Sequence, residues 1–155
     1  MNALSFVFLV MQLDDTYFMK QAMVEAEKAF SADEVPVGAV VVVGNQIIAR
    51  AHNLIERLND VTAHAEMQAI TSAANFLNGK YLVGCTLYVT LEPCIMCAGA
   101  LTWSQIDSVV YAASDPMRGF VQAGVNLHPK TDIRKGIMSK ESEDLLDRFF
   151  RKKRS

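Results

Sequence analysis

The sequence predicts a three-layer α/β/α domain around a mixed sheet of five strands. Short runs of β-branched residues alternate along the chain with longer segments of helical periodicity, the pattern of helices that cover both faces of a sheet. The chain has 155 residues, of which 51% are apolar and 21% are charged. This length and composition suit one globular domain with a sizeable core.

The first predicted helix runs to about Phe30 and is capped by residues 14–16, whose sequence is Asp-Asp-Thr. Its apolar positions recur at helical spacing, at Phe18, Ala22, Ala26 and Ala29. Residues 39–43 form a continuous run of apolar residues, mostly valine, typical of a strand buried on both faces. The Gly44-Asn45 turn then predicts a hairpin with residues 46–51 as its second strand.

The second half repeats the alternation of strands and helices. A helix is predicted from Ala63 to Leu77, because Asn78-Gly79 is a helix stop signal. Pro93 suits the first turn of a further helix that reaches about Ser104. The remaining predictions are strands at 86–90, 108–111 and, weakly, 133–138, a loop at 112–130, and a last helix from residue 139 or 140 with Leu145, Leu146, Phe149 and Phe150 on its apolar stripe.

The first ten residues, Met1–Val10, are nearly all apolar. No basic residue precedes this run and no small-x-small cleavage site follows it, so it lacks the features of a signal peptide. It is also too short to span a bilayer. We interpret residues 1–13 as an extension or a mis-assigned start, with Met11 as an alternative first residue, and residues 14–155 as a single domain.

Charge and cysteine content limit the choice of partners and compartment. The formal net charge is −2, so any contact with nucleic acid has to come from a local basic patch. The sequence has three cysteines, an odd number that disfavours a disulfide framework and fits a reducing cytoplasm. We therefore expect a cytoplasmic protein that is not bound to a membrane.

Two short motifs carry the residues with chemistry. The first is His64-Ala65-Glu66 and the second, thirty residues further on, begins at Pro93 and reads Pro-Cys-Ile-Met-Cys. Each motif follows a predicted strand and opens a predicted helix. Together they supply one imidazole, one carboxylate and the thiols of Cys94 and Cys97.

This set of side chains matches a catalytic zinc site. Cys94 and Cys97 are three positions apart, so on a helix they share one face, and the start of a helix favours thiolates. Two thiolates and the imidazole of His64 are a known ligand set that leaves the fourth tetrahedral position to water. Zinc lowers the pKa of that water from about 15.7 to roughly 7, which makes hydroxide available near neutral pH.

Glu66 is predicted to be the acid/base and not a ligand. Positions two apart do not share a helix face, so His64 and Glu66 reach one site only if His64 lies at the very start of the helix. From there Glu66 can take a proton from the water and deliver protons to the substrate ring and the leaving amine.

Other interpretations of the motifs remain. A lone Cys-x-x-Cys is equally typical of a redox pair or of half a structural zinc site. A structural zinc needs a fourth protein ligand, for which Cys85, His52 and His128 are the remaining candidates. A non-catalytic, zinc-stabilised binding module is a further alternative, against which Glu66 argues.

His-x-Glu followed by Pro-Cys-x-x-Cys is the signature of zinc-dependent nucleobase deaminases. At these residues the chain resembles the cytidine/deoxycytidylate deaminase superfamily, and within it the bacterial tRNA adenosine deaminases. The resemblance runs from about Asp15 to Arg154. It rests on residues 34–40, 53, 62–66, 86–100 and 145–151, which read EVPVGAV, N, TAHAE, TLYVTLEPCIMCAGA and LLDRFFR.

The resemblance implies a cytidine-deaminase-like fold, one Zn²⁺ per subunit on His64, Cys94 and Cys97, and Glu66 as acid/base. It implies hydrolytic deamination of adenosine to inosine at the wobble position of tRNA, with release of ammonia. The substrate would be an anticodon stem-loop, and the protein a homodimer. Five further residues would contact or border the flipped nucleotide: Asn53, Val35, Ala65, Leu91 and Asp115.

Several of these residues also have simpler interpretations. Asn53 could stabilise the loop that follows the hairpin, and Asp115 could start a turn before Pro116. Residues 116–120 read PMRGF where the family usually has a Lys-x-Gly-Ala run, and Trp103 stands where smaller or polar residues are common. The role of the altered loop is therefore open.

One basic cluster lies at the end of the predicted last helix. It consists of Arg148, Arg151, Lys152, Lys153 and Arg154. These residues could bind RNA phosphates, or they could only stabilise the C-terminal end of the helix dipole. The resemblance favours RNA. Deamination of a free base such as guanine or cytosine is the main alternative, since it needs the same zinc motif but no basic end.

Overall fold

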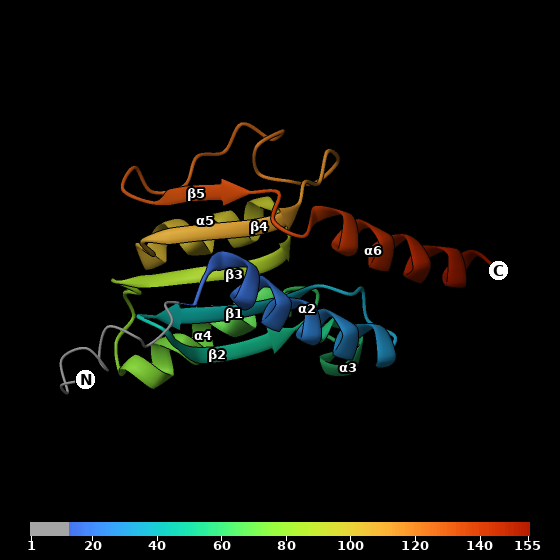
Figure 1. The fold of residues 1–155 in the computed structure, drawn as a ribbon, viewed down its shortest axis with the longest axis horizontal. Helices are drawn as coiled ribbons and strands as arrows, with labels where there is room; N and C mark the ends of the chain where they lie inside the picture. Colours follow the sequence, from blue (N-terminus) through green and yellow to red (C-terminus); the bar gives the residue numbers. More distant parts are fainter. Residues whose placement is uncertain (1–12) are drawn as a thin grey trace, which may run out of the picture.

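The computed structural model describes residues 13–155, so the interpretation of Met1–Val10 concerns residues outside the described part. Strands and helices alternate along the chain (Figure 1). The first half comprises α2 (Asp15–Ser31), β1 (Gly38–Val43), β2 (Gln46–His52), α3 (Ile55–Leu58) and α4 (Ala65–Leu77). The second half comprises β3 (Cys85–Leu91), α5 (Ile95–Ser104), β4 (Ser108–Ala113), β5 (Asp132–Lys135) and α6 (Ser139–Arg154).

The five strands form one mixed sheet, in the order β2-β1-β3-β4-β5. β1 is antiparallel to both β2 and β3, whereas β4 is parallel to β3 and to β5. The predicted mixed five-stranded sheet is confirmed. Because β3 and β4 are parallel and joined by α5, their carboxyl ends meet at one edge, where the sheet presents the residues that follow each strand.

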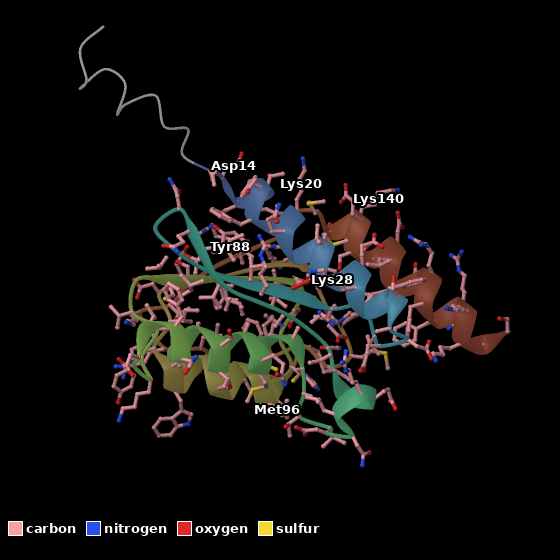
Figure 2. All side chains as sticks on the ribbon, turned by 90° about the horizontal axis from the view of Figure 1, so that it is seen from below. Asp14, Lys20, Lys28, Tyr88, Met96 and Lys140 are labelled. Carbon is pink, nitrogen blue, oxygen red and sulfur yellow. The ribbon has the colours of Figure 1, made fainter. Side chains whose placement is uncertain are left out.

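Helices cover both faces of the sheet, as predicted. α2 and α6 lie on one face, and α4 and α5 lie on the other (Figure 2). Side chains alternate between these faces along each strand. Val41, Leu87 and Val109 pack in the core under α4 and α5, whereas Val40 and Val110 pack in the core under α2.

α2 approaches the sheet closely at one glycine. A Cβ atom on Gly38 would lie 2.1 Å from the carbonyl oxygen of Ala22 and 2.3 Å from the amide nitrogen of Ala26. Because only glycine leaves room for this contact, the helix lies directly against the first residue of β1. The loop 32–37 between them is fixed as a result, and this loop carries Glu34 and Val35.

The structure corrects several predicted boundaries. α4 begins at Ala65 and not at Ala63, because His64 is the extended N-cap residue. Pro93 lies before α5 and not in its first turn, because its carbonyl oxygen accepts a hydrogen bond from Phe120 N–H at 3.0 Å. The fifth strand is shorter than predicted and ends before Gly136, whose φ is +96°. The short helix α3 was not predicted. No helix within residues 13–155 combines the length and apolar character needed to cross a membrane.

Candidate active site

His64 and Glu66 lie at the start of α4. His64 is the N-cap residue, with the extended backbone angles φ −70° and ψ 154°, and Glu66 lies in the first helical turn. The prediction that His64 precedes regular helix geometry is confirmed. In a regular helix the side chains of His64 and Glu66 would point in different directions. The change from extended to helical backbone instead places both at the same end of α4.

Cys94 and Cys97 lie at the start of α5. Cys94 is the N-cap residue, with φ −73° and ψ 175°, and Cys97 belongs to the first turn. The spacing predicted that the two residues share one face of a regular helix. This is wrong in detail, because Cys94 lies before the helix. They converge because Cys94 precedes the helix, where Gly119 pairs with it in an isolated β-bridge.

The three predicted ligands come together. The Nδ1 atom of His64 lies 3.6 Å from the sulfur of Cys94 and 3.6 Å from the sulfur of Cys97. Tetrahedral zinc with Zn–S of about 2.3 Å and Zn–N of about 2.0 Å requires a nitrogen–sulfur separation of about 3.5 Å. The donor set and its spacing therefore fit a zinc ion.

The group has three members within the described part of the chain: His64, Cys94 and Cys97 have ligand atoms within 4.8 Å of one another. Cys85, His52 and His128, the candidates for a fourth ligand, do not join it. Cys85 begins β3, whereas Cys94 follows the other end of that strand. A ligand group of three favours an open, catalytic site over a closed, structural one.

The two thiols differ in acidity. The neighbouring Cys97 thiol and the His64 ring lower the pKa of Cys94 to about 4. The Cys94 sulfur, together with burial, raises the pKa of Cys97. The same sulfur raises the pKa of His64 above its usual value. The pair of thiols therefore loses its first proton at Cys94, the half-buried residue at the start of the helix.

Glu66 lies beside the ligand group without belonging to it. The residue is only 4% exposed. Burial raises the pKa of its carboxyl to about 7, although the nearby His64 has the opposite effect. A buried carboxyl next to a group of metal ligands is typical of a proton-transfer residue.

Asn53 is held beside the site by α4. Its Oδ1 atom accepts a hydrogen bond of 2.8 Å from the backbone N–H of Ala65, and the residue is buried. This contact fixes the plane of the amide and occupies the Ala65 N–H group. Within residues 13–155, Nδ2 of Asn53 donates to no protein group, and its one side-chain hydrogen bond is through Oδ1.

Val35 and Leu91 are partly buried and pack on the core cluster under α4 and α5. Leu91 is the last residue of β3, three positions before Cys94, and Val35 follows the buried Glu34. Both side chains therefore take part in the core packing on this face of the sheet.

Asp115 caps a turn. Its Oδ1 atom accepts hydrogen bonds from the backbone N–H groups of Met117 (3.1 Å) and Arg118 (3.0 Å). The simpler interpretation of Asp115, as the start of a turn before Pro116, is therefore present in the structure. Phe120, at the end of the altered loop, is buried against Tyr111 with a distance of 6.1 Å between ring centroids.

The basic cluster lies on the last turns of α6, but its members have different surroundings. Arg148 and Lys152 lie over the ring of Phe30, at 5.1 and 5.5 Å from its centroid. Lys153 forms an ion pair of 2.6 Å with Asp33. Among residues 13–155, Arg151 and Arg154 have no carboxylate within ion-pair distance and are exposed. Part of the cluster is therefore structural, and two arginines remain available to a partner.

The sequence reasoning missed two buried carboxylates next to the site, Glu34 and Glu92. Each accepts hydrogen bonds from two backbone N–H groups of a distant loop. The sequence contains no local signal for either role, because the partner N–H groups lie 22 to 29 positions away along the chain.

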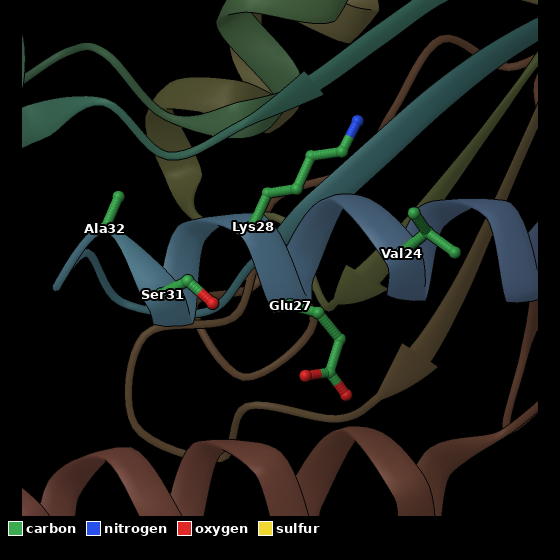
Figure 3. Close-up of a pocket in the computed structure, with 5 residues that line it drawn as sticks. All are labelled: Val24, Glu27, Lys28, Ser31 and Ala32. Carbon is green, nitrogen blue, oxygen red and sulfur yellow. The ribbon is translucent and has the colours of Figure 1, made fainter.

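Two surface hollows lie away from the ligand group. The first is a shallow depression on α2, where the side chains of Glu27 and Lys28 point to opposite sides of the helix and do not converge (Figure 3). The second has a volume of about 690 Å³ and lies between α3 and the end of α6. Its lining includes Val35, Arg57 and Lys153, so it extends from the loop before β1 to the basic end of α6.

Comparison with known proteins identifies the class of enzyme to which the chain belongs. Residues 13–154 match the family model of MafB19-like deaminases, and the fold and the ligand group together define a deaminase. The chain is 46% identical over 144 residues to a tRNA-specific adenosine deaminase of Aquifex aeolicus, a match that covers 90% of this chain and 95% of the relative. The chain belongs to the family of tRNA-specific adenosine deaminases.

Solved structures agree with this assignment. A structure from a study of A-to-I editing by deaminases at the wobble position of transfer RNA superposes with a TM-score of 0.77. It is 43% identical, and the match covers 84% of this chain and 99% of that one. A guanine deaminase from Bacillus subtilis has a TM-score of 0.64 and 38% identity, with 72% and 71% of the two chains covered.

Proposed function

We propose that the protein is a zinc-dependent enzyme that deaminates adenosine to inosine at the wobble position of tRNA. The observation that carries the reaction is the convergence of His64, Cys94 and Cys97, with the buried Glu66 beside them. The relatives named tRNA-specific adenosine deaminases, which match 90% of the chain, support the substrate. A cytoplasmic location follows from this substrate.

Each side chain has a defined task in this reaction. His64, Cys94 and Cys97 would hold one Zn²⁺ per subunit, which acidifies a water molecule toward a pKa of roughly 7. The carboxylate of Glu66 accepts a proton from the attacking water. It then donates protons to the adenine ring and to the departing amine nitrogen, which leaves as ammonia.

The substrate is oriented by residues around the reacting carbon. The Nδ2 group of Asn53 donates to an acceptor on the edge of the flipped base, because Oδ1 is already bonded to Ala65 N–H. Val35 and Leu91 would line the pocket with apolar surface. Asp115 lies in the loop next to the Cys94 turn, where it would face the backbone of the nucleotide.

The basic end of α6 supports RNA as the substrate. Figure 1 shows that the C-terminal part of α6 extends past the ends of the strands, at the same end of the molecule as α3. The hollow between α3 and α6 connects this basic end with Val35. An unstacked anticodon loop could follow this path, with its phosphates near Arg151 and Arg154.

An apolar helix surface supports a homodimer. Ile95 and Trp103 are 58% and 84% exposed and lie two turns apart on α5, so they project from one side of the helix. α5 contains no charged residue. A helix that is apolar on its outward side is typical of a buried interface.

The similarity to a guanine deaminase leaves one alternative to the tRNA substrate, which is the deamination of a free base at the same zinc site. It is the weaker likeness, in both TM-score and coverage. The deciding experiment measures inosine formation in an anticodon stem-loop with adenosine at the wobble position, with free adenosine, guanine and cytidine assayed in parallel. We expect inosine in the stem-loop only. Ammonia released only from a free compound would refute tRNA as the substrate, and no turnover of any compound by the zinc-loaded protein would favour a binding module.

A further inference from the structure

Two buried carboxylates border the active site without belonging to it. Glu34 is 1% exposed and Glu92 is 5% exposed. Within residues 13–155, neither carboxylate has a basic side chain within ion-pair distance. A carboxylate removed from water is costly unless hydrogen bonds compensate it, so these two positions need a physical explanation.

The compensation comes from backbone N–H groups, in the same arrangement at both residues. Glu34 accepts from the N–H of Glu56 through Oε1 (2.9 Å) and from the N–H of Arg57 through Oε2 (3.0 Å). Glu92 accepts from the N–H of Asp115 through Oε1 (3.1 Å). Its Oε2 atom accepts from the N–H of Val121 (3.1 Å). Hydrogen bonds to an ionised acceptor are stronger than neutral ones, so each carboxylate fastens one loop at two points.

Both fastened loops adjoin residues of the reaction site. The α3 loop, residues 54–63, joins Asn53 to His64 and is closed by a hydrogen bond of 3.0 Å from Leu54 N–H to Ala63 O. The Asp115 loop, residues 114–121, lies against the Cys94 turn, because Gly119 forms a β-bridge with Cys94. The first loop therefore adjoins Asn53 and His64, and the second adjoins Cys94.

The Asp115 loop makes room for the carboxylate of Glu92 at Gly119. A Cβ atom on Gly119 would lie 1.9 Å from Oε2 and 2.3 Å from Cδ of Glu92. A Cβ atom would also lie 2.6 Å from the backbone carbonyl oxygen of Asp115. The backbone of Gly119 does not have a positive φ, so the position requires glycine because of these close contacts and not because of conformation. Glu92 and Gly119 thus form a matched pair, at the point where the loop touches the Cys94 turn.

We propose that Glu34 and Glu92 are positioning residues, which hold the α3 loop and the Asp115 loop in the conformation that binds the RNA strand. Neither residue touches the reacting atoms. Each acts through the loop that it fastens. The proposal rests on the proposed function, because the RNA substrate gives the two loops their task.

The first test measures the loops themselves, by hydrogen–deuterium exchange of Glu34→Gln and Glu92→Gln. Glutamine keeps one acceptor oxygen but turns an amide NH₂ toward the second backbone N–H. We expect exchange to become about tenfold faster at the released amides, within residues 54–63 for Glu34→Gln and within residues 114–121 for Glu92→Gln. Each variant is the control for the other. Unchanged exchange, or equal changes in both loops, would overturn the proposal.

The second test separates positioning from a merely structural role. With the anticodon stem-loop as substrate, we expect each variant to raise KM about tenfold while kcat stays within about twofold and the zinc content is unchanged. Glu27→Gln, on the exposed side of α2, is the matched control and should behave as the wild type. A lower Tm with an unchanged KM would show that the carboxylates only stabilise the fold, and would refute the proposal.

A third variant perturbs the same contact from the loop side. Gly119→Ala should reproduce the faster exchange and raised KM of Glu92→Gln, whereas Gly79→Ala, whose Cβ would meet only Leu77 O at 4.0 Å, should not. Normal KM and exchange in Gly119→Ala would contradict the matched pair. If the wild type does not deaminate the stem-loop, the proposed function fails, and the exchange measurements still decide whether the carboxylates fasten the loops.

Discussion

At the scale of the residue, the extended backbone at His64 and Cys94 decides which side chains meet. Both are N-cap residues, so each lies directly before the helical turn that carries Glu66 or Cys97. The acid and the ligands therefore occupy one site although they come from two helices. The same geometry leaves Glu66 outside the ligand group.

Replacement of Glu66 by glutamine tests its role. The change removes the group that transfers protons but keeps its size and leaves His64, Cys94 and Cys97 intact. We expect turnover of the stem-loop to fall on the order of 10²–10⁴-fold, while the variant still binds one zinc ion per chain. Inosine formation and zinc content would be measured on the same preparation. Unchanged turnover would exclude Glu66 as the proton shuttle, and loss of the zinc would show that it acts as a ligand.

The site could be predicted from the sequence where its signal is local. His64, Glu66, Cys94 and Cys97 lie in two short motifs whose spacing suits a metal, and the structure brings them together. Glu34 and Glu92 carry no such signal, because their partners are backbone N–H groups 22 to 29 positions away. Only the tertiary fold shows that these acidic residues are buried and what they hold.

At the scale of the element, the edge strand β5 is fastened to α2 by an ion-pair network. Arg134 of β5 donates to Asp15 from Nε at 2.9 Å and from a terminal nitrogen at 3.1 Å. Tyr88 of β3 donates to the same carboxylate at 2.7 Å. β5 has four residues and is mostly exposed, so this network supplies side-chain support that a short strand lacks.

The network predicts a pH dependence of stability. Hydrogen bonds from Arg134 and Tyr88 hold the pKa of Asp15 below its ordinary value of 3.8. Because the folded state favours the ionised form, the stabilisation is complete above the ordinary pKa and is lost as the pH falls through the lowered one. We expect Asp15→Asn to lose about 1 kcal/mol at neutral pH, or about 3 °C in Tm, because the pair is partly exposed.

The wild type and Asp15→Asn should have the same stability in acid. Thermal unfolding of the wild type and of Asp15→Asn, followed by circular dichroism from pH 7 to about pH 2, should show the difference in Tm shrink toward zero below about pH 4. Asp147→Asn, an exposed position on α6, controls for the general loss of a negative charge. A difference in Tm that stays constant down to the lowest pH would contradict the assignment.

The strand β5 is an element that the sequence predicts only weakly, whereas other elements follow clearly from it. The long helices and the hairpin follow from periodicity and turn residues, and they were predicted. β5 is a weak strand that depends on pairing with β4 and on the Arg134 network. α3 has four residues, and its first N–H groups are satisfied by Glu34 from another segment. Such elements exist because of tertiary contacts, so their local sequence is a poor guide to them.

At the scale of the whole molecule, the exposed apolar side of α5 predicts self-association. We expect the protein to sediment as a dimer at micromolar concentration. We expect Trp103→Glu to be a monomer, because a charge buried in an apolar interface stays unpaired. Val24→Glu, an exposed apolar position on α2 in the opposite layer, is the matched control and should remain a dimer. A monomeric wild type would refute the dimer, and a dimeric Trp103→Glu would place the interface elsewhere.

The basic end of α6 predicts how RNA binding depends on salt. The net charge of −2 gives no general attraction, so affinity has to come from a local group of exposed basic residues that are not engaged by the protein. Arg151 and Arg154 are such residues, whereas Lys153 is paired with Asp33 and Lys152 lies over Phe30. Each phosphate contact on a single strand contributes about 0.7 to the slope of log K against log salt.

The double variant Arg151→Ala/Arg154→Ala should therefore bind the stem-loop more weakly and with a slope shallower by about 1.4. Binding would be measured by fluorescence anisotropy over a series of salt concentrations. Lys140→Ala, at the opposite end of the same helix (Figure 2), is the matched control and should keep the slope of the wild type. Because a helix-dipole role would lower Tm and leave the slope unchanged, the slope separates RNA binding from helix stabilisation at this cluster.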